Sequence, residues 1–205
     1  MPKSPVKNLS KYRMKKVFKD KIFDIDHILT FRKPVERDNK YKKMNPKGIK
    51  LHIAKTQPEI APMIKTFPKM ADFFREYIEK DIIAFFATKD NSVVGYIFAT
   101  EDDFYDRHLW KNTVHVKPGE FFHFAGYVSP GSRGSIVSLF ILQGMYDYFE
   151  NKGLSAAITT ISSRNEPSWR LCRKFGYDQI EKAWDVYKFL GFRWSREVPT
   201  RTWVG

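Results

Sequence analysis

Apolar residues first alternate with polar ones and then recur at helical spacing between residues 49 and 80. The alternation at Ile49–Ile53 predicts a strand. Thr56 stands where a helix N-cap is expected and Pro58 follows it, so a helix should begin there. Pro68 interrupts the pattern, which resumes as a second helix to about Lys80. The apolar positions at helical spacing are Ile60, Met63, Ile64, Phe67, Met70, Phe73, Phe74, Tyr77 and Ile78. One strand and two helices are therefore predicted.

Two longer apolar runs follow, at Ile82–Thr88 and Val93–Thr100. The four residues between them, Lys89–Ser92, are turn-forming, so the runs predict an antiparallel hairpin. The next segment, Glu101–Lys117, is polar and irregular. After it, Glu120–Val128 is rich in aromatic and β-branched residues and predicts the central strand.

A third helix is predicted at Ser138–Lys152, because its apolar residues share one face and Gly153 can end it in a left-handed conformation. Leu154–Ile161 predicts another strand. Asn165–Phe175 predicts a short helix with a proline in its first turn and Gly176 just past its end.

Two closing strands are predicted at Tyr177–Ile180 and Val186–Phe192. The order of elements predicts an α/β fold with a mixed sheet and helices on both faces. A chain of 205 residues with 42% hydrophobic content favours one domain with extensions. We expect a basic N-terminal extension at residues 1–48, partly docked on the main body, and a domain at residues 49–205.

Composition narrows the class of protein. No run reaches the roughly 18 apolar residues of a membrane helix, and the N-terminus does not resemble a signal peptide. The single cysteine, Cys172, excludes an intramolecular disulfide and a cysteine-based metal cluster, which suits a reducing compartment. We therefore expect a soluble cytoplasmic protein without a metal site.

The positive charge is concentrated at the N-terminus. Of the formal charge of +13, residues 1–50 contribute +11, from sixteen Lys or Arg residues against five Asp or Glu. A segment such as Lys3–Lys21 could bind nucleic acid, anionic lipid or an acidic carrier protein. It could equally be a solvated, partly helical extension.

The segment Val128–Ser135 offers the clearest chemistry. It contains Pro130, Arg133 and Gly134 between a predicted strand and a predicted helix. Such a turn aims main-chain N–H groups at one point, and the helix N-terminus adds partial positive charge. Gly134 lets the backbone approach a ligand closely. The segment therefore predicts a pyrophosphate-binding loop.

A second motif lies downstream, at Asn165-x-x-Ser168-x-x-Leu171-Cys172-x-x-Phe175-Gly176-Tyr177. With these two ordered motifs the sequence resembles the GNAT superfamily of N-acetyltransferases. The family's loop reads V-x-P-x-Y-R-G-x-G and its later motif N-x-x-A/S-x-x-L-Y-x-x-x-G-F. The resemblance covers Ile82 to Phe192, extends plausibly from Ile49, and implies a mixed, mostly antiparallel GNAT-like sheet.

The resemblance also implies a binding site for acetyl-CoA or another acyl-CoA. In that family the central strand splays from its neighbour and pairs with the pantetheine arm. The residues implied for cofactor binding are Gly126, Tyr127, Val128, Arg133, Gly134, Ser135, Ile136, Val137, Ser138 and Asn165. Ile136 replaces a glycine of the family and cannot take positive φ cheaply, so the loop geometry could differ.

The acid and base of the reaction are less clearly marked. Cys172 occupies the place of the tyrosine that commonly protonates the CoA thiolate, and a thiol with a pKa of about 8.5 could do this or simply pack in the core. Phe122 stands where one branch of the family has a catalytic Glu. Glu120, about 6.5 Å along the same strand, and His123, on the opposite face, are the candidate bases.

Two further features bear on the acceptor. Glu101–Asp106 holds an acidic cluster that could attract a cationic amine or could be a solvated loop. Aromatic residues at Phe85, Phe86, Phe121, Phe122 and Phe124 are expected mostly in the core, although a surplus could line a pocket for a longer acyl chain.

The sequence as a whole predicts an acyl-CoA-dependent N-acyltransferase that works by direct transfer in a ternary complex. Family analogy slightly favours an amino sugar as the amine, in the branch associated with surface-polysaccharide or small-metabolite modification. The alternatives are an enzyme that takes acyl groups from an acyl carrier protein, a non-catalytic CoA-binding module, and nucleic-acid binding through residues 1–50.

Overall fold

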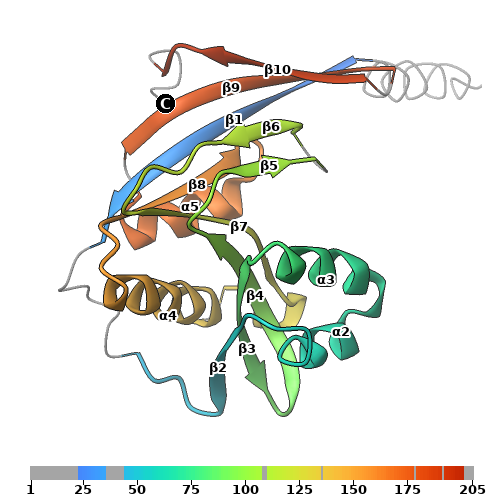
Figure 1. Ribbon diagram of the computed structural model, residues 1–205, viewed down its shortest axis with the longest axis vertical. Coiled ribbons are helices and arrows are strands. Elements are labelled where there is room, and N and C mark those ends of the chain that lie inside the picture. Colours follow the sequence, from blue (N-terminus) through green and yellow to red (C-terminus); the bar gives the residue numbers. More distant parts are fainter. Residues whose placement is uncertain are drawn as a thin grey trace, which may run out of the picture.

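The computed structural model describes residues 23–35, 44–107, 110–134, 136–177, 179–190 and 192–200 (Figure 1). The strands are β1 (Phe23–Pro34), β2 (Ile49–Ala54), β3 (Ile83–Lys89), β4 (Ser92–Thr100), β5 (Phe104–Asp106), β6 (Asn112–Val114), β7 (Glu120–Val128), β8 (Ala156–Ser162), β9 (Gln179–Phe189) and β10 (Phe192–Val198). The helices are α2 (Ala61–Thr66), α3 (Ala71–Glu79), α4 (Val137–Asn151) and α5 (Glu166–Phe175), with 3-10 turns η1 (Pro68–Met70) and η2 (Pro130–Ser132).

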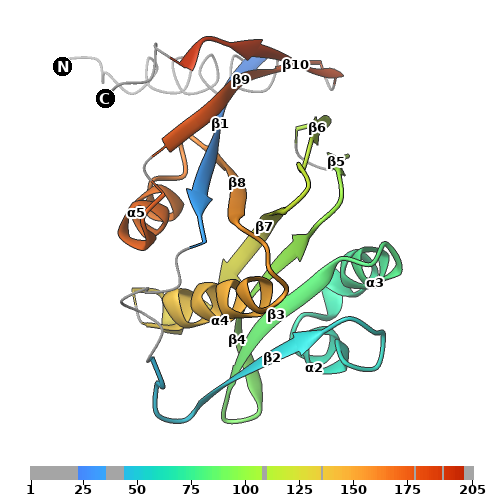
Figure 2. The same ribbon diagram turned by 60° about the vertical axis from the view of Figure 1, so that its left-hand side comes forward.

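Eight strands form one twisted sheet in the order β10-β9-β1-β8-β7-β4-β3-β2, and β5 and β6 form a separate hairpin. All neighbours in the large sheet are antiparallel except β7 and β8, which are parallel. Helices α4 and α5 cover one face, and α2 and α3 cover the other (Figure 2). The predicted α/β fold, with a mixed and mostly antiparallel sheet and helices on both faces, is confirmed.

Glycines end the two helices nearest the central strands. Gly153 has φ 84 and follows α4, whose last turn is closed by a bond from Leu154 N–H to the carbonyl of Phe149 (3.0 Å). Gly176 has φ 96 and lies just past α5, where Tyr177 N–H donates to the carbonyl of Cys172 (2.9 Å). The left-handed conformation predicted for Gly153 is confirmed, and Gly176, predicted just past the end of its helix, adopts it too.

Part of the segment 1–48, predicted as an extension that is partly docked on the main body, belongs to the sheet. Strand β1 comes from the segment 1–48 and lies between β8 and β9, with Ile28, Leu29 and Phe31 buried in the core. Its register runs from Ile28↔Ser162 to Pro34↔Ala156 on the β8 side. The strand escapes prediction because charged residues flank its short apolar run.

Two other differences concern the second half of the chain. The segment expected to be irregular, residues 101–117, contains the β5–β6 hairpin. The two short closing strands are replaced by the single long strand β9, which is followed by β10 at the sheet edge.

In the part of the chain that the structure describes, no helix is long and apolar enough to span a membrane. The basic segment Lys3–Lys21 lies outside the described residues, and its binding to nucleic acid or a carrier protein stays a prediction.

Candidate active site

The central strands β7 and β8 start side by side and then fan apart (Figure 1). Their parallel pairing extends only from Glu120↔Ala156 to His123↔Thr159. Beyond it β7 stays paired with β4 as far as Val128, while β8 stays paired with β1. The residues from Phe124 to Val128 therefore form an open stretch of β7, whose edge towards β8 has no strand partner among the described residues.

A bulge shapes the open stretch. Ala125 has φ 51, and Ala125 and Gly126 together lie opposite the single residue Ile97 of β4. Both are exposed, although they lie in the middle of an eight-stranded sheet. Main-chain N–H and C=O groups in such a position can pair with an extended ligand as they would with another strand.

The loop after β7 leads into the N-terminus of α4. Ser129 N–H donates to the carbonyl of Val94 (2.9 Å), which ties the loop to β4. Arg133 is exposed, and its Nε lies 3.4 Å from the carbonyl oxygen of Val128 at the end of the open stretch. Gly134 has φ 72 and open space around its Cα. The loop therefore runs directly from the open stretch to the helix N-terminus.

The helix N-terminus has the geometry of an anion site. Ile136 occupies the N-cap position of α4 with φ −68, and no side-chain hydrogen bond caps this end. The positive φ that the sequence analysis associates with Ile136 falls on Gly134 instead, so Ile136 is unstrained. The side chain of Val137 is buried, so only the main chain of that residue can face a ligand. Ser138 follows it in the first turn, and Ser135 lies outside the described residues.

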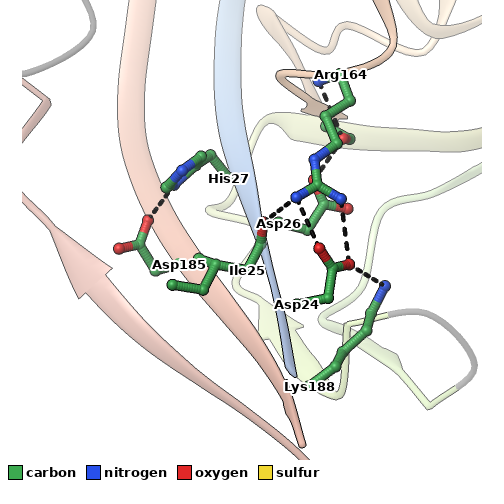
Figure 3. Close-up of polar contacts among 8 residues, drawn as sticks. Asp24, Ile25, Asp26, His27, Arg164, Asp185 and Lys188 are labelled. Atoms are coloured by element: carbon green, nitrogen blue, oxygen red, sulfur yellow. Dashed lines mark hydrogen bonds and ion pairs between the residues drawn. The ribbon is translucent and has the colours of Figure 1, made fainter. Parts of the chain in front are cut away.

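Asn165 is the N-cap of α5 and follows β8, on the other side of the split between β7 and β8. Its side-chain oxygen accepts a hydrogen bond from Ser168 N–H (3.3 Å), so this N-cap leaves the amide NH2 group unused. The loop before it is held by β1: the guanidinium of Arg164 donates to both carboxylate oxygens of Asp24 (3.1 and 2.7 Å) and to the carbonyl of Ile25 (Figure 3). Arg164 is also the main reason why the pKa of Asp24 is lowered.

Further contacts attach the same loop to β1. Ser162 Oγ donates to Asp26 (2.6 Å), and Ser163 N–H donates to the carbonyl of His27 (2.7 Å). His27 in turn pairs with Asp185 of β9 (2.6 Å; Figure 3). Strand β1, which the sequence analysis places outside the domain, therefore fixes the position of Asn165.

His123 lies at the vertex of the split and is buried. The hydroxyl of Tyr177 lies 2.5 Å from its Nε2 and accepts a bond from the hydroxyl of Tyr146 (2.6 Å). Burial lowers the pKa of His123 to about 3, so the ring is neutral. Its Nδ1 has no partner among the described residues. His123 is thus part of a buried polar chain rather than an exposed base.

Cys172 is buried in the core between α5 and the sheet. Burial raises its pKa to about 12, well above the pKa of about 8.5 on which its predicted role as an acid depends. A thiol in this state is a weak proton donor at neutral pH. The structure supports the packing role that the sequence left open.

Glu120 lies at the start of β7, five residues before the bulge, a distance of about 17 Å along the strand. It is 4% exposed, and both Nε and Nη2 of Arg32 approach its Oε1 to 2.8 Å. The structure therefore places Glu120 in a buried ion pair with β1 and does not bring it to the open stretch.

A cavity of about 80 Å³ opens on the α2–α3 face of the split. Phe124 and Ala125 of the open stretch line it, together with residues of α3, β5, β6, β8 and β9. Seven aromatic side chains belong to its lining: Phe73, Tyr77, Phe104, Trp110, Phe122, Phe124 and Trp184. The remaining members are Asp106, Asn112, Val114, Ala125 and Thr160, and the space is called the Thr160 cavity below.

Two polar atoms in the lining have no partner in the described part of the chain. They are Thr160 Oγ1, in a residue that is 8% exposed, and Asn112 Nδ2. The pKa of Tyr77 is raised well above its usual value, mainly by burial and to a smaller extent by the nearby charge of Asp106. No local motif points to Thr160, Asn112 and Trp184, because these residues meet only through the sheet.

The acidic cluster at residues 101–106 is dispersed by the fold. Of its four carboxylates, only that of Asp106 belongs to a residue lining the Thr160 cavity. Asp103 accepts bonds from Val116 N–H (2.8 Å) and His115 (2.6 Å), and Glu101 pairs with Lys152. Of the aromatic residues singled out in the sequence, Phe122 and Phe124 line the cavity, whereas the other three are buried in the core.

Comparisons with known proteins agree with this geometry. Residues 52–177, more than half of the chain, match the acetyltransferase (GNAT) family. The chain belongs to this family of N-acyltransferases and takes its acyl group from acyl-CoA. The open stretch of β7 and the uncapped N-terminus of α4 fit the amide-containing arm and the pyrophosphate of that cofactor. No curated protein matches the sequence significantly.

Several solved structures are similar to the chain. A tandem GNAT protein from the clavulanic acid biosynthesis pathway has 12% identity and a TM-score of 0.58, over 98% of this chain and 62% of that one. A Drosophila protein has 11% identity and a TM-score of 0.57, over 90% and 58%. An aminoglycoside N-acetyltransferase in complex with CoA has 17% identity and a TM-score of 0.48, over 64% and 93%. The first two show the same fold.

Proposed function

We propose that the protein transfers an acyl group from acyl-CoA directly to a small-molecule amine within a ternary complex. The observation that carries this proposal is the open stretch of β7, which has the N-terminus of α4 at one end and the Thr160 cavity beside it. The donor and acceptor could thus meet at the bulge of Ala125 and Gly126 from opposite faces of the sheet. No residue is required as a covalent carrier.

The roles of the residues follow from their chemistry. The main chain from Gly134 to Ser138 would hold the pyrophosphate, because amides at a helix N-terminus favour an anion. The main chain from Gly126 to Val128 would pair with the amide-bearing arm, and the NH2 group of Asn165 could donate to it. A main-chain N–H in the open stretch would polarise the acyl carbonyl.

When bound, acyl-CoA supplies an activated thioester: the amine nitrogen bonds to the carbonyl carbon, the carbon–sulfur bond breaks, and an alkylammonium yields an amide, the CoA thiol and one proton. Because His123, Cys172 and Glu120 are buried, water in the exposed part of the split is the expected route for that proton. His123 packs at the vertex, whereas Cys172 and Glu120 support the fold away from it.

Two-substrate kinetics tests the direct transfer. With acetyl-CoA and an amine varied together, a ternary complex gives intersecting double-reciprocal lines. Parallel lines, or an acylated protein seen by intact-mass spectrometry in the absence of amine, would show a covalent intermediate and contradict the proposal.

Two glycines of the loop provide a matched pair of variants. Gly134 has φ 72, Gly131 does not have a positive φ, and a Cβ added to either would meet no heavy atom within 4 Å. Gly134→Ala should therefore strain the loop by about 1–2 kcal/mol and raise the Kd of acetyl-CoA about tenfold. Gly131→Ala should leave the Kd within about twofold. Equal effects of the two variants would show that the loop geometry does not matter for binding.

A further inference from the structure

The lining of the Thr160 cavity is mostly aromatic or aliphatic. Nine of the twelve residues that line it are apolar or aromatic, and the others are Asp106, Asn112 and Thr160. Of the described residues in the lining, Asp106 is the one that carries a charge. A surface of this kind can hold a single cationic group but offers few partners for hydroxyl groups.

We infer that the Thr160 cavity binds the acceptor as a primary amine on an unsubstituted hydrocarbon body, with the ammonium group held against Asp106. That the bound amine is the acceptor rests on the proposed function, whereas the binding preference rests on the cavity alone. This preference departs from the amino sugar that family analogy favours.

The polar atoms of the cavity match one amine and little more. The carboxylate of Asp106 and the hydroxyl of Thr160 can accept hydrogen bonds from an ammonium group. Asn112 Nδ2, which has no partner among the described residues, is a donor with two N–H groups, so it can serve at most two oxygen atoms and cannot bond to the ammonium group itself. The aromatic faces add attraction for a cation.

A sugar ring would present several hydroxyl groups to this lining. Each hydroxyl that is buried without a partner weakens binding by about fivefold or more. A hydrocarbon body avoids this loss, and each methylene group that the cavity buries strengthens binding by about fourfold.

The size of the cavity limits how much of the amine enters. Its volume of about 80 Å³ is well below the roughly 300–1,000 Å³ of pockets that enclose a drug-sized ligand. The cavity thus has room for the amine-bearing end and its first carbons, while the rest of the body would lie at the mouth.

Binding to the protein without acyl-CoA tests the inference. Pentylamine, pentanol and glucosamine are titrated separately into the full chain, and the indole N–H signals of Trp110 and Trp184 are followed by NMR. These signals are assigned with Trp110→Phe and Trp184→Phe. Pentylamine should bind at least about tenfold more tightly than pentanol, because only the amine carries a charge, and at least about tenfold more tightly than glucosamine.

A variant cycle identifies the carboxylate. Asp106→Asn should weaken pentylamine about tenfold and change pentanol less than about twofold. Asp102→Asn, an exposed carboxylate of the same segment that lies outside the cavity, should change neither. Thermal unfolding of each variant shows whether it is folded. If a variant does not fold, the comparison of the three ligands on the unmodified chain still tests the inference.

Several results would overturn the inference. They are glucosamine binding as tightly as pentylamine, no shift of either indole signal with any amine, or an equal loss of pentanol and pentylamine in Asp106→Asn. The proposed function fails separately, if acetyl-CoA does not bind or amines that occupy the cavity are not acylated.

Discussion

His123 makes the stability of the fold depend on pH in a way that can be isolated. The ring is buried and neutral, and burial lowers its pKa from 6.5 to about 3. In the unfolded chain the same ring takes up a proton below about pH 6.5. Because the unfolded state then binds more protons than the folded state, the free energy of unfolding falls as the pH falls from 6.5 towards 3.

The magnitude follows from the two pKa values. At pH 7 the unfolded ring is mostly neutral and the effect is small. At pH 5 the folded ring is still neutral, whereas the unfolded ring is almost fully protonated, which lowers the free energy of unfolding by about 2 kcal/mol relative to pH 7. This contribution should be absent from His123→Gln, which cannot take up the proton.

Urea unfolding followed by circular dichroism at pH 7 and pH 5 measures the effect. The difference between the two pH values should be about 2 kcal/mol smaller in His123→Gln than in the unmodified chain. Tyr177→Phe is the control: it removes the hydroxyl next to His123 but keeps the ring buried, so it should lower stability at both pH values and retain the difference. An unchanged difference in His123→Gln would refute the assignment of a buried neutral ring.

Other variants test the supports of the split sheet. Gly95→Ala would place a Cβ 3.0 Å from the carbonyl oxygen of Tyr127, and should cost about 1–3 kcal/mol in urea unfolding; no loss would show that β4 and β7 can move apart freely. Arg32→Met leaves Glu120 buried without its partner and should cost about 3 kcal/mol, part of which Glu120→Gln restores, with no change in the Kd of acetyl-CoA; a large rise in that Kd would contradict the purely structural role. Asp24→Asn removes the ion pair with Arg164 that holds the loop before Asn165, so the Kd of acetyl-CoA, measured by calorimetry, should rise severalfold. The free energy of unfolding should change by less than about 1 kcal/mol, because the Asp24–Arg164 pair is partly exposed.

The helices and the central strands could be predicted because their signals are local. The apolar face of α4 and the glycines after α4 and α5 act within a few residues of each element. Strand β1 could not be predicted in this way. Its charged residues are compatible with a central strand only because distant partners neutralise them, as Glu120 does for Arg32 and Arg164 for Asp24.

The cofactor-binding half of the site could be predicted from local signals, whereas the cavity half could not. The loop from Val128 to Gly134 and the cap at Asn165 are contiguous motifs, so the sequence reveals them directly. The Thr160 cavity combines residues from six elements, and its lining residues Asp106 and Trp184 are far apart in the chain. The positions of the candidate acid and bases along a strand or helix do not reveal the burial that the fold imposes on Cys172 and His123.

Thermal unfolding with and without acetyl-CoA tests whether the chain binds acyl-CoA. A ligand that binds the native state at one hundred times its Kd stabilises it by about 2.7 kcal/mol, which for a chain of this length raises the Tm by about 5–11 °C. We expect a rise of this size with acetyl-CoA. An unchanged Tm with saturating acetyl-CoA, CoA and longer acyl-CoAs would contradict it.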